Sequence, residues 1–524
     1  MKTYTSFNNQ NRIRNSSQSA AFGLAYNVIS LLLTFIFRTV FIKILSAEYL
    51  GINGLFTNIL NLLSLAELGV GTCIAYRLYN PIANDDPVRV AMLMDFYKKI
   101  YRIIAAVVLV IGLSIMPALK YLIKDISELP PNVNLDFVYF LFLINNVSSY
   151  FFSYRLNLVL ADQKSYKNSI YNIIQMTVVN AVKILFLVLT KNYTLILILD
   201  IAIKIAMNFV YSLIVRKQYA FVFSLKANLD KETKKAILKD TTGMLSYRIG
   251  DNLSNSIDNI LISSFVGMSI VGIYSNYSMI TVAVCTILAQ LFSATSASLG
   301  NLRQKADVKK YREIYEHLHF VNLWIASCCV ICFYVLINPF IIVWIGQEYL
   351  LDKLIVAVLA INMFCGQMRH VNYIVIDTSG LFTKQKWRPI AEQVINLILS
   401  IVLVKFIGLS GIFIGTIISR LVLQVWMEPC LIYKTQFQAK PTIYFLKLAF
   451  FVIFTIGVGY GLGELMSLMD NSLGFVVLKF AITMVVPSII LAIMLFWTKD
   501  FKYFWGLIIR VCRRIKRKFS RKTF

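Results

Sequence analysis

Histidine and acidic residues are scarce in this sequence, and a phosphate-binding loop is missing. Its 524 residues include 3 His and 26 Asp plus Glu, against 52 Lys plus Arg. Only His317, His319 and His370 can act as imidazole bases, and no base and nucleophile cluster together, which disfavours a membrane-embedded transferase. No Gly-x-x-x-x-Gly-Lys-Ser/Thr motif occurs, which excludes direct ATP hydrolysis by such a loop. We therefore expect neither enzymatic activity nor a cofactor.

Long polar segments are also lacking. The longest expected cytoplasmic connection, at about 216–241, is too short for a nucleotide-binding domain. The longest connection on the other side, at about 120–136, leaves no room for an external catalytic domain. The polar N-terminal segment leads into a full-length apolar stretch, without a small-residue cleavage site. We therefore expect no soluble domain and no cleaved signal peptide.

Fourteen strongly apolar stretches fill almost the whole chain. Each is long enough to cross the hydrocarbon core of a bilayer as an α-helix. The sequence therefore predicts an all-α polytopic membrane protein with about 14 transmembrane helices. The expected spans are 20–45, 50–76, 101–119, 137–160, 168–189, 194–215, 242–265, 270–297, 319–345, 354–377, 389–407, 411–433, 442–464 and 474–497.

The connections between these stretches are alternately rich and poor in Lys and Arg. Cytoplasmic loops carry the excess of basic residues, so the rich set is assigned to the cytoplasm, and both termini are expected there too. The net charge of +26 is mostly this loop bias, and nucleic-acid binding is not expected. The basic connections contain Arg12 and Arg14, Lys98 and Lys99, Lys164 and Lys167, the run from Arg216 to Lys239, Arg303 to Arg312, Lys384 to Arg388, Lys434 and Lys440, and the C-terminal tail.

Eight cysteines suggest a metal or redox site, which their surroundings do not favour. Cys328, Cys329 and Cys332 lie in a stretch rich in Phe, Ile and Val, with no acidic residue nearby. Cysteine in such a setting acts as a small apolar packing residue. No metal site is therefore expected.

Polar residues recur on one face of two expected spans. In the first span, Asn27, Thr34 and Arg38 fall with Gly23 and Ser30 within a wedge of about 80°. Charged groups at this depth usually line a cavity or a transport path, although Asn, Ser and Thr also hydrogen-bond between packed helices. In the seventh span, a wedge of about 120° holds Arg248, Asp251, Asn252, Asn255, Asp258 and Asn259.

The two polar faces coincide when the halves of the chain are overlaid so that Arg38 falls on Asn259. In the same overlay the turn at Gly51 falls on the turn at Gly272. The sequence therefore predicts two pseudo-symmetric six-helix lobes followed by two further helices. The expected divisions are 1–217 for the N-terminal lobe, 218–241 for a cytoplasmic linker, 242–440 for the C-terminal lobe, 441–497 for helices 13 and 14, and 498–524 for a basic amphipathic tail.

One stretch of the sequence resembles a known family. Residues 68–85 read LGVGTCIAYRLYNPIAND and are followed by Phe96, Tyr97, Lys98, Lys99 and Tyr101. The stretch resembles the bacterial polysaccharide exporters of the Wzx-type flippase family, in the MATE-like MOP exporter superfamily, and the resemblance extends over the first two spans and the following loop. It implies a MATE-like fold. It also implies a flippase that carries undecaprenyl-diphosphate-linked oligosaccharide repeat units across the bacterial cytoplasmic membrane by alternating access, for surface polysaccharide biosynthesis.

Arginine suits such a cargo, because its paired donors match the geometry of phosphate in a cavity of low dielectric constant. Arg38 and Arg248 are therefore the leading candidates to bind the diphosphate. Asp200 and Lys204, four residues apart, are expected to pair with each other. The other candidate contacts to head group or sugar are Asn27, Thr34, Asn252, Asn255, Asn259 and Arg369, and further charged residues within spans are Lys183, His370, Asp377 and Arg420.

Carboxylates within the spans leave a second transporter class open. Glu67, Asp251 and Asp258 are candidates to couple transport to protons or sodium, and Glu67 is also a candidate counter-ion of an arginine. In the alternative function, an ion-coupled MATE-like exporter of small cationic compounds, these carboxylates would be the active groups. The expected partners of a flippase are the lipid-linked oligosaccharide, membrane lipids, and the polymerase and glycosyltransferases of the same pathway.

Overall fold

The structure is a computed structural model in which α-helices are joined by short connections. It describes residues 7, 12–67, 70–124, 130, 133–225, 229–235, 237, 256–293, 295–305, 307–381, 384, 385, 387–506, 509 and 513. No strand occurs within these ranges. The chain divides into two compact units, Met1–Ser275 and Asn276–Phe524. The predicted all-α fold is thus confirmed for the described residues.

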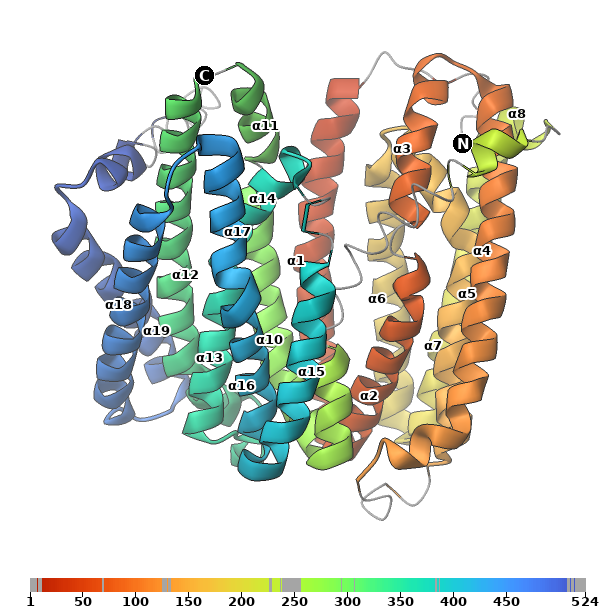
Figure 1. Ribbon diagram of the computed structural model, residues 1–524. Helices are drawn as coiled ribbons and strands as arrows, with labels where there is room; N and C mark the ends of the chain where they lie inside the picture. Colours follow the sequence, from red (N-terminus) through yellow and green to blue (C-terminus); the bar gives the residue numbers. More distant parts are fainter. Residues whose placement is uncertain are drawn as a thin grey trace, which may run out of the picture. The chain divides into compact units, whose positions relative to one another are not determined.

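The first unit contains the helices that precede Ser275 (Figure 1). Within it α1 packs along α6, and α5 packs along both α4 and α7. Its elements are α1 (Arg12–Ile44), α2 (Ala47–Leu63), the 3₁₀ turn η1 (Ser64–Glu67), α3 (Val70–Ala83), α4 (Pro87–Ile115), η2 (Met116–Tyr121), α5 (Leu135–Ala161), α6 (Ser165–Thr190), α7 (Tyr193–Gln218), α8 (Ala220–Phe223), a helix at 256–265 and the beginning of α10 (Met268–Ser293).

Local sequence explains where several of these helices begin. The Asn134 side chain accepts a 3.0 Å hydrogen bond from a backbone amide in the first turn of α5, and Asn192 accepts one of 3.1 Å at the start of α7. Asp86 caps α4 in the same way, and Pro87 occupies the first helical position, where its missing N–H costs nothing. The polar residues between apolar stretches therefore end one helix and start the next.

The second unit is built around α12, against which α13, α18 and α19 pack. α15 and α16 form a tight pair whose turn contains Gly408, at a φ of 60° that favours glycine. The elements are the rest of α10, α11 (Ser296–Lys305), α12 (Val308–Trp344), η4 (Gln347–Tyr349), α13 (Lys353–Gln367), α14 (His370–Thr378), α15 (Arg388–Ile407), α16 (Leu409–Ser419), the π-helical turn η6 (Arg420–Gln424), α17 (Val425–Ile432), η7 (Tyr433–Phe437), α18 (Thr442–Ser467) and α19 (Leu473–Leu495).

Twelve helical spans among the described residues are long and apolar enough to cross a membrane, close to the fourteen expected. The span expected at 50–76 is not one of them, because α2 and α3, of 17 and 14 residues, are separated by η1 and by residues 68 and 69. Of the span expected at 242–265, residues 242–255 lie outside the described residues. The chain is a multi-pass membrane protein.

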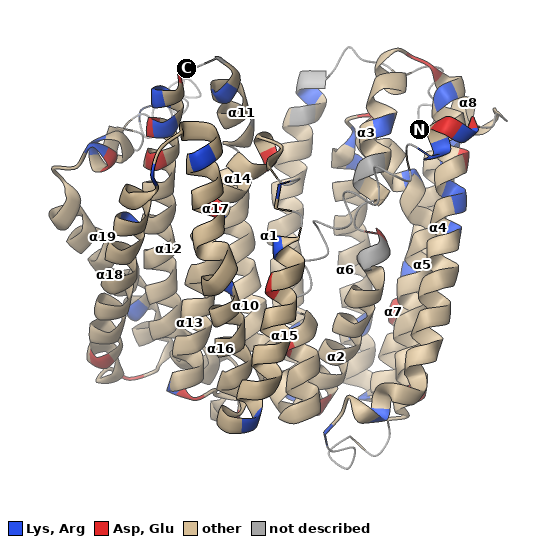
Figure 2. Ribbon diagram, in the orientation of Figure 1, with Lys and Arg blue, Asp and Glu red and all other residues tan. Residues whose placement is uncertain are grey.

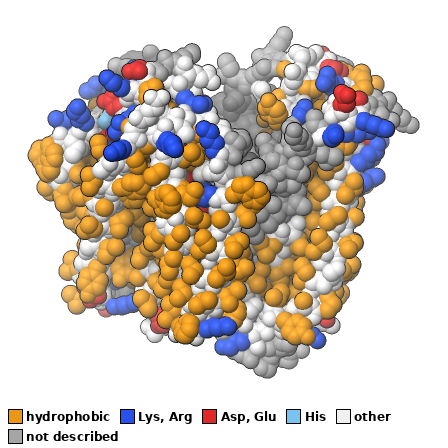
Figure 3. Space-filling model, in the orientation of Figure 1, with side chains coloured by type: hydrophobic (Ala, Val, Ile, Leu, Met, Phe, Trp, Pro, Cys, Tyr) orange, Lys and Arg blue, Asp and Glu red, His pale blue; other side chains and the backbone are white. Residues whose placement is uncertain are grey.

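The surface of the helices fits a lipid environment. On the face shown in Figure 3, hydrophobic side chains cover the middle of the helices, and Lys and Arg side chains gather toward the helix ends. Figure 2 shows the same distribution on the ribbon, with few charged residues in the middle of the helices. The charged residues that do lie inside the spans are therefore exceptions that need a physical reason.

Two glycines that coincide in the predicted repeat lie close together within the first unit. A Cβ on Gly51 of α2 would lie 2.1 Å from the Met268 backbone oxygen, and a Cβ on Gly272 of α10 would lie 2.0 Å from the Ala47 oxygen. The two helices begin at Ala47 and Met268, which coincide in the overlay that aligns the halves of the sequence. Each glycine thus lets the other helix's backbone approach closely, and the contact is reciprocal.

The C-terminal tail begins as a helix at 499–506 that is attached to the second unit. The Asp500 carboxylate lies 2.6 Å from His317 Nδ1 of α12 and 2.7 Å from Lys447 Nζ of α18. Phe501 packs against Trp324 with 5.8 Å between ring centres. The rest of the predicted amphipathic tail, apart from residues 509 and 513, lies outside the described residues.

Candidate functional site

Three of the predicted binding residues lie on one face of α1. Asn27, Thr34 and Arg38 are half-buried there. The Arg38 guanidinium donates a hydrogen bond to the Ser275 hydroxyl of α10, which donates to the Gly272 carbonyl at 2.6 Å. The opposite face of α1 is apolar and exposed, as expected for contact with lipid, through Leu24, Val28, Leu32 and Ile36.

A cationic cluster lies between α6 and α7 of the same unit. Asp200 accepts a 2.7 Å hydrogen bond from Lys204, which confirms the pairing expected from their spacing. The Lys183 ammonium lies 3.6 Å from the other oxygen of the same carboxylate and 4.0 Å from the centre of the Phe37 ring. Two ammonium groups therefore share one carboxylate, and the cluster keeps a net positive charge inside the membrane-spanning helices.

Glu67 lies where the second expected span is interrupted. It ends the 3₁₀ turn η1 and interacts with the Tyr101 hydroxyl, which accepts a 3.1 Å hydrogen bond from Asn157. One turn earlier, Ser64 accepts a 2.9 Å hydrogen bond from Tyr150. Among the described residues, no Lys or Arg forms an ion pair with Glu67, so the counter-ion alternative lacks a partner there. The carboxylate is instead surrounded by hydroxyl and amide groups of α4 and α5.

The second unit contains a network of three arginines and two glutamates. Glu428 accepts a 2.7 Å hydrogen bond from Arg369 and lies 3.0 Å from Arg388, which also donates to Glu392 at 2.6 Å. The side chains of Arg388 and Glu428 are each 1% exposed. Arg420 is the third arginine and acts on Glu392 electrostatically. Three guanidinium groups against two carboxylates leave this network with a net positive charge.

Arg369 lies between α13 and α14, where another long span is interrupted. Besides Glu428, its guanidinium contacts the Gln424 amide, whose oxygen, once the amide is oriented to accept, lies 2.8 Å from Nη1. The guanidinium also lies 5.7 Å from the centre of the Tyr373 ring. Arg369 is therefore bound to several groups of its own unit.

The remaining predicted residues fall at or beyond the limits of what the structure describes. Arg248, Asp251, Asn252 and Asn255 lie outside the described residues. Asp258 and Asn259 are buried in the helix at 256–265. Within the described ranges, no group of three or more His, Cys, Asp or Glu side chains is placed to hold a metal ion.

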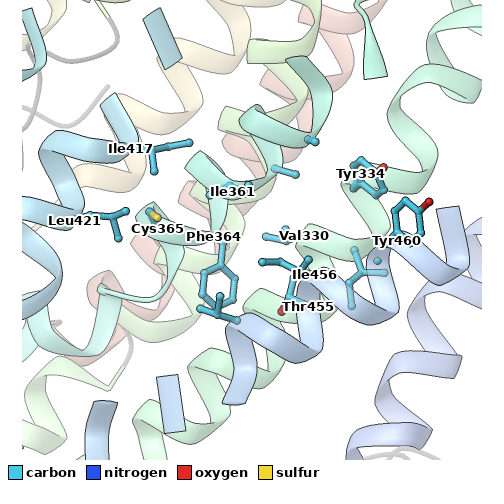
Figure 4. Close-up of a pocket in the computed structure, with 15 residues that line it drawn as sticks. Val330, Tyr334, Ile361, Phe364, Cys365, Ile417, Leu421, Thr455, Ile456 and Tyr460 are labelled. Atoms are coloured by element: carbon cyan, nitrogen blue, oxygen red, sulfur yellow. The ribbon is translucent and has the colours of Figure 1, made fainter. Parts of the chain in front are cut away.

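An apolar pocket of about 320 Å³ opens between α12, α13, α16 and α18 of the second unit (Figure 4). Figure 4 shows Leu421, Ile417 and Cys365 on one side of it and Tyr334 and Tyr460 on the other. Several lining residues have exposed side chains, among them Leu421 at 50% and Tyr460 at 64%. The pocket is therefore open at the surface of the unit and suited to an alkyl or isoprenoid chain.

Sequence comparison connects these observations with a known family. The sequence profile of the family described as "Polysaccharide biosynthesis protein" matches residues 17–297, which is more than half of the chain. The chain belongs to this polysaccharide biosynthesis protein family. The match includes residues 68–85, and it confirms the resemblance inferred from that stretch. No curated protein matches the chain in sequence.

Solved structures confirm the MATE-like fold of this polysaccharide biosynthesis protein. "Lipid II flippase MurJ, inward closed conformation" aligns with a TM-score of 0.66 and 13% identity, over 91% of this chain and 100% of that one. A multidrug resistance MATE family transporter of the MOP superfamily in its inward-facing conformation aligns with a TM-score of 0.52 and 14% identity, over 75% and 91%. At these identities the likeness concerns the fold alone.

Several charged residues of this family member were not singled out from its sequence. Arg388 belongs to a connection that the sequence predicts to be cytoplasmic, and no polar face predicted from the sequence includes Glu392 or Glu428. The four-residue spacing of Arg388 and Glu392 was a usable indication of their pair. No spacing rule connects Glu428 with Arg369, which lies far away in the sequence, between α13 and α14.

Proposed function

We propose that this protein is a flippase for undecaprenyl-diphosphate-linked oligosaccharide repeat units of surface polysaccharide biosynthesis. It works by alternating access without ATP hydrolysis. It lies in the bacterial cytoplasmic membrane with both termini in the cytoplasm. Its family and its fold support a lipid-linked cargo, and the chemistry of its spans supports an anionic one.

The observation that carries the proposal is the excess of positive charge inside the spans. In the first unit, Lys183 and Lys204 share the single carboxylate of Asp200. In the second, Arg369 and Arg388 pair with Glu428 and Glu392, and Arg420 lies nearby without an ion pair among the described residues. A charge at this depth is costly unless it serves a partner, and a diphosphate supplies the opposite charge. Arg38 and Arg248, which lie on the two polar faces that coincide in the overlay, are assigned to the diphosphate.

Other groups take the remaining parts of the cargo and the coupling ion. Asn27 and Thr34, with Asn252, Asn255 and Asn259 of the second polar face, contact the sugars, and Arg369 adds a charged contact. The apolar pocket of the second unit accepts part of the isoprenoid chain. Glu67, Asp251 and Asp258 are assigned to ion coupling. The partners are membrane lipids and the polymerase and glycosyltransferases that act before and after transport.

The second candidate function is ion-coupled export of small cationic compounds. It is favoured by the MATE fold and by Glu67, a half-buried carboxylate at a helix interruption with no basic partner among the described residues. It is disfavoured by the two clusters of excess positive charge, which would repel a cationic cargo.

The deciding experiment measures the lipid-linked sugars of cells depleted of this protein, beside their surface polysaccharide. The expected result is accumulation of an undecaprenyl-diphosphate oligosaccharide together with loss of the surface polymer. Both should return to normal when the wild-type chain is expressed again. An unchanged lipid-linked pool with normal surface polymer would contradict the flippase and favour the exporter of small compounds.

A further inference from the structure

Arg420 has no carboxylate within ion-pair distance among the described residues. Its Nη1 donates to the Asn362 backbone oxygen at 3.1 Å and to the Asn362 side-chain oxygen at 2.5 Å. Both acceptors are neutral, so they orient the guanidinium without cancelling its charge. Arg369 and Arg388 differ in this respect, because both contact Glu428 directly. The excess charge of the network therefore resides mainly on Arg420.

Arg420 lies deep within a membrane span. One continuous span runs from Leu409 to Phe437, and Arg420 lies in its interior. At the rise of an α-helix, Arg420 is about 16 Å from one end of the span and about 26 Å from the other. Asn362 lies in the interior of α13, at about 14 Å from its start. A charged side chain without an ion pair is costly at this depth, and such residues usually mark a substrate or ion pathway.

The backbone also changes at this residue. Arg420 is the first residue of the π-helical turn η6, which interrupts the long helical span formed with α16 and α17. Single π turns within α-helices are frequently found at functional sites. The Arg420 side chain is half-buried, and its two hydrogen bonds within the described part of the chain both come from Nη1, not from Nε or Nη2. Half of the guanidinium fork is therefore left for a ligand.

The apolar pocket lies beside this cation. Its lining includes Ile361 and Cys365 of α13, on either side of Asn362 in the sequence, and Leu421, which follows Arg420. Leu421 and Cys365 lie on the same side of the pocket in Figure 4. The two helices that hold the cation thus also supply one wall of the pocket. An amphiphile with a phosphate group joined to an apolar chain satisfies both features.

We propose that Arg420, positioned by Asn362, binds a phosphate group of an isoprenoid-linked diphosphate whose chain enters the adjacent pocket. This inference rests on the proposed flippase function and adds a binding residue for its cargo. The free nitrogens of the guanidinium donate to two phosphate oxygens, a geometry that arginine matches and lysine does not. The first isoprene units then pack against the apolar side chains that line the pocket.

The test measures binding of defined probes to the purified full-length protein in phosphatidylcholine nanodiscs. The probes are undecaprenyl diphosphate, undecaprenol, inorganic pyrophosphate and phosphatidylglycerol. Arg420→Gln should weaken binding of undecaprenyl diphosphate about tenfold or more, because a charge-assisted contact is lost. Binding of undecaprenol should not change, and Arg420→Lys should be intermediate. Lys434→Gln, which removes an exposed cation near the end of the same span, is the matched control and should bind like the wild type.

Equal affinity of Arg420→Gln and the wild type for undecaprenyl diphosphate would overturn the inference. An equal loss of undecaprenol binding in the folded Arg420→Gln variant would also overturn it, because Arg420 would then act on the apolar chain and not on a phosphate group. Equal binding of pyrophosphate or phosphatidylglycerol would overturn the assignment to an isoprenoid-linked phosphate. Failure of the flippase function itself would be recognised separately, by unchanged lipid-linked pools in depleted cells.

Discussion

Glu428 lies between two arginines and is almost completely buried. Its side chain is 1% exposed, as is that of Arg388, while Arg369 is 18% exposed. Taking such charges out of water is costly, and close contacts repay that cost only while every partner is present. The carboxylate therefore has a structural role that is separate from any contact of the network with cargo.

Replacing this carboxylate should destabilise the protein. Glu428→Gln keeps the size and a hydrogen-bond acceptor but removes the charge that both arginines share. We expect a loss of about 3 kcal/mol in the free energy of unfolding, since breaking a buried ion pair leaves an uncompensated charge. The measurement is the thermal unfolding midpoint of the detergent-purified protein, which should fall by several degrees.

Glu313→Gln is the control for this substitution. Its carboxylate is 62% exposed and lies 3.6 Å from His317, so its loss should change the midpoint little. If Glu428→Gln unfolded at the same temperature as Glu313→Gln, the ion pairs of Glu428 would contribute nothing measurable to stability.

Ion pairs within one helix can be predicted from the sequence, whereas ion pairs between helices cannot. Asp200 and Lys204 were recognisable because a spacing of four places them on the same face. The contact of Glu428 with Arg369 depends on how α14 and α17 pack, which no local rule encodes. The difference between Arg420 and the other two arginines likewise depends on contacts between helices, since Arg369 and Arg388 reach Glu428 and Arg420 reaches Asn362.

Interruptions distinguish two of the membrane spans and the span that was expected at 50–76. η1 separates α2 from α3 at Glu67, α13 and α14 are separated at Met368 and Arg369, and a π turn begins at Arg420. Each interruption places a charged side chain where the regular hydrogen bonding of the helix is disturbed. Such discontinuous helices recur at the binding sites of transporters, because the freed backbone and the polar side chains line a cavity.

The contact between α2 and α10 should depend on the absence of a side chain at Gly272. In Gly272→Ala the new Cβ would lie 2.0 Å from the Ala47 oxygen and 3.2 Å from the Gly51 nitrogen, so backbone must move. We expect a loss of about 1–3 kcal/mol from overpacking. The check is the thermal unfolding midpoint, measured together with complementation of export in depleted cells.

Gly461→Ala is the matched control on α18. Nothing lies within 4 Å of a Cβ at that position, and alanine is favoured over glycine in a helix by about 1 kcal/mol. The control should therefore be neutral or slightly stabilising. If Gly272→Ala behaved like Gly461→Ala, the close approach of the two helices would not be required.

The topology of the whole molecule can be tested by cysteine accessibility. In a background without the eight native cysteines, a cysteine replacing Lys384 should resist a membrane-impermeant maleimide in intact cells. A cysteine replacing Lys191, between α6 and α7, should react, because that connection belongs to the set poor in basic residues. Mass shift of the purified protein measures both.

Permeabilised cells provide the control for this experiment, since both cysteines should then react. Labelling of the position 384 variant in intact cells would contradict the assigned orientation. It would also remove the support for two lobes related by a parallel repeat.

The sequence by itself determined the class of fold and most of its helices. Apolar runs of membrane length can only be helices in lipid, because each backbone group must be hydrogen-bonded within its own segment. The predicted repeat also aligned Gly51 with Gly272, and the structure brings the backbones at these two glycines close together. Only the tertiary structure decided where α2 is interrupted, which charges form ion pairs, and that Arg420 bonds to Asn362 near an apolar pocket. Those features depend on distances between helices far apart in sequence, and periodicity along one helix carries no information about them.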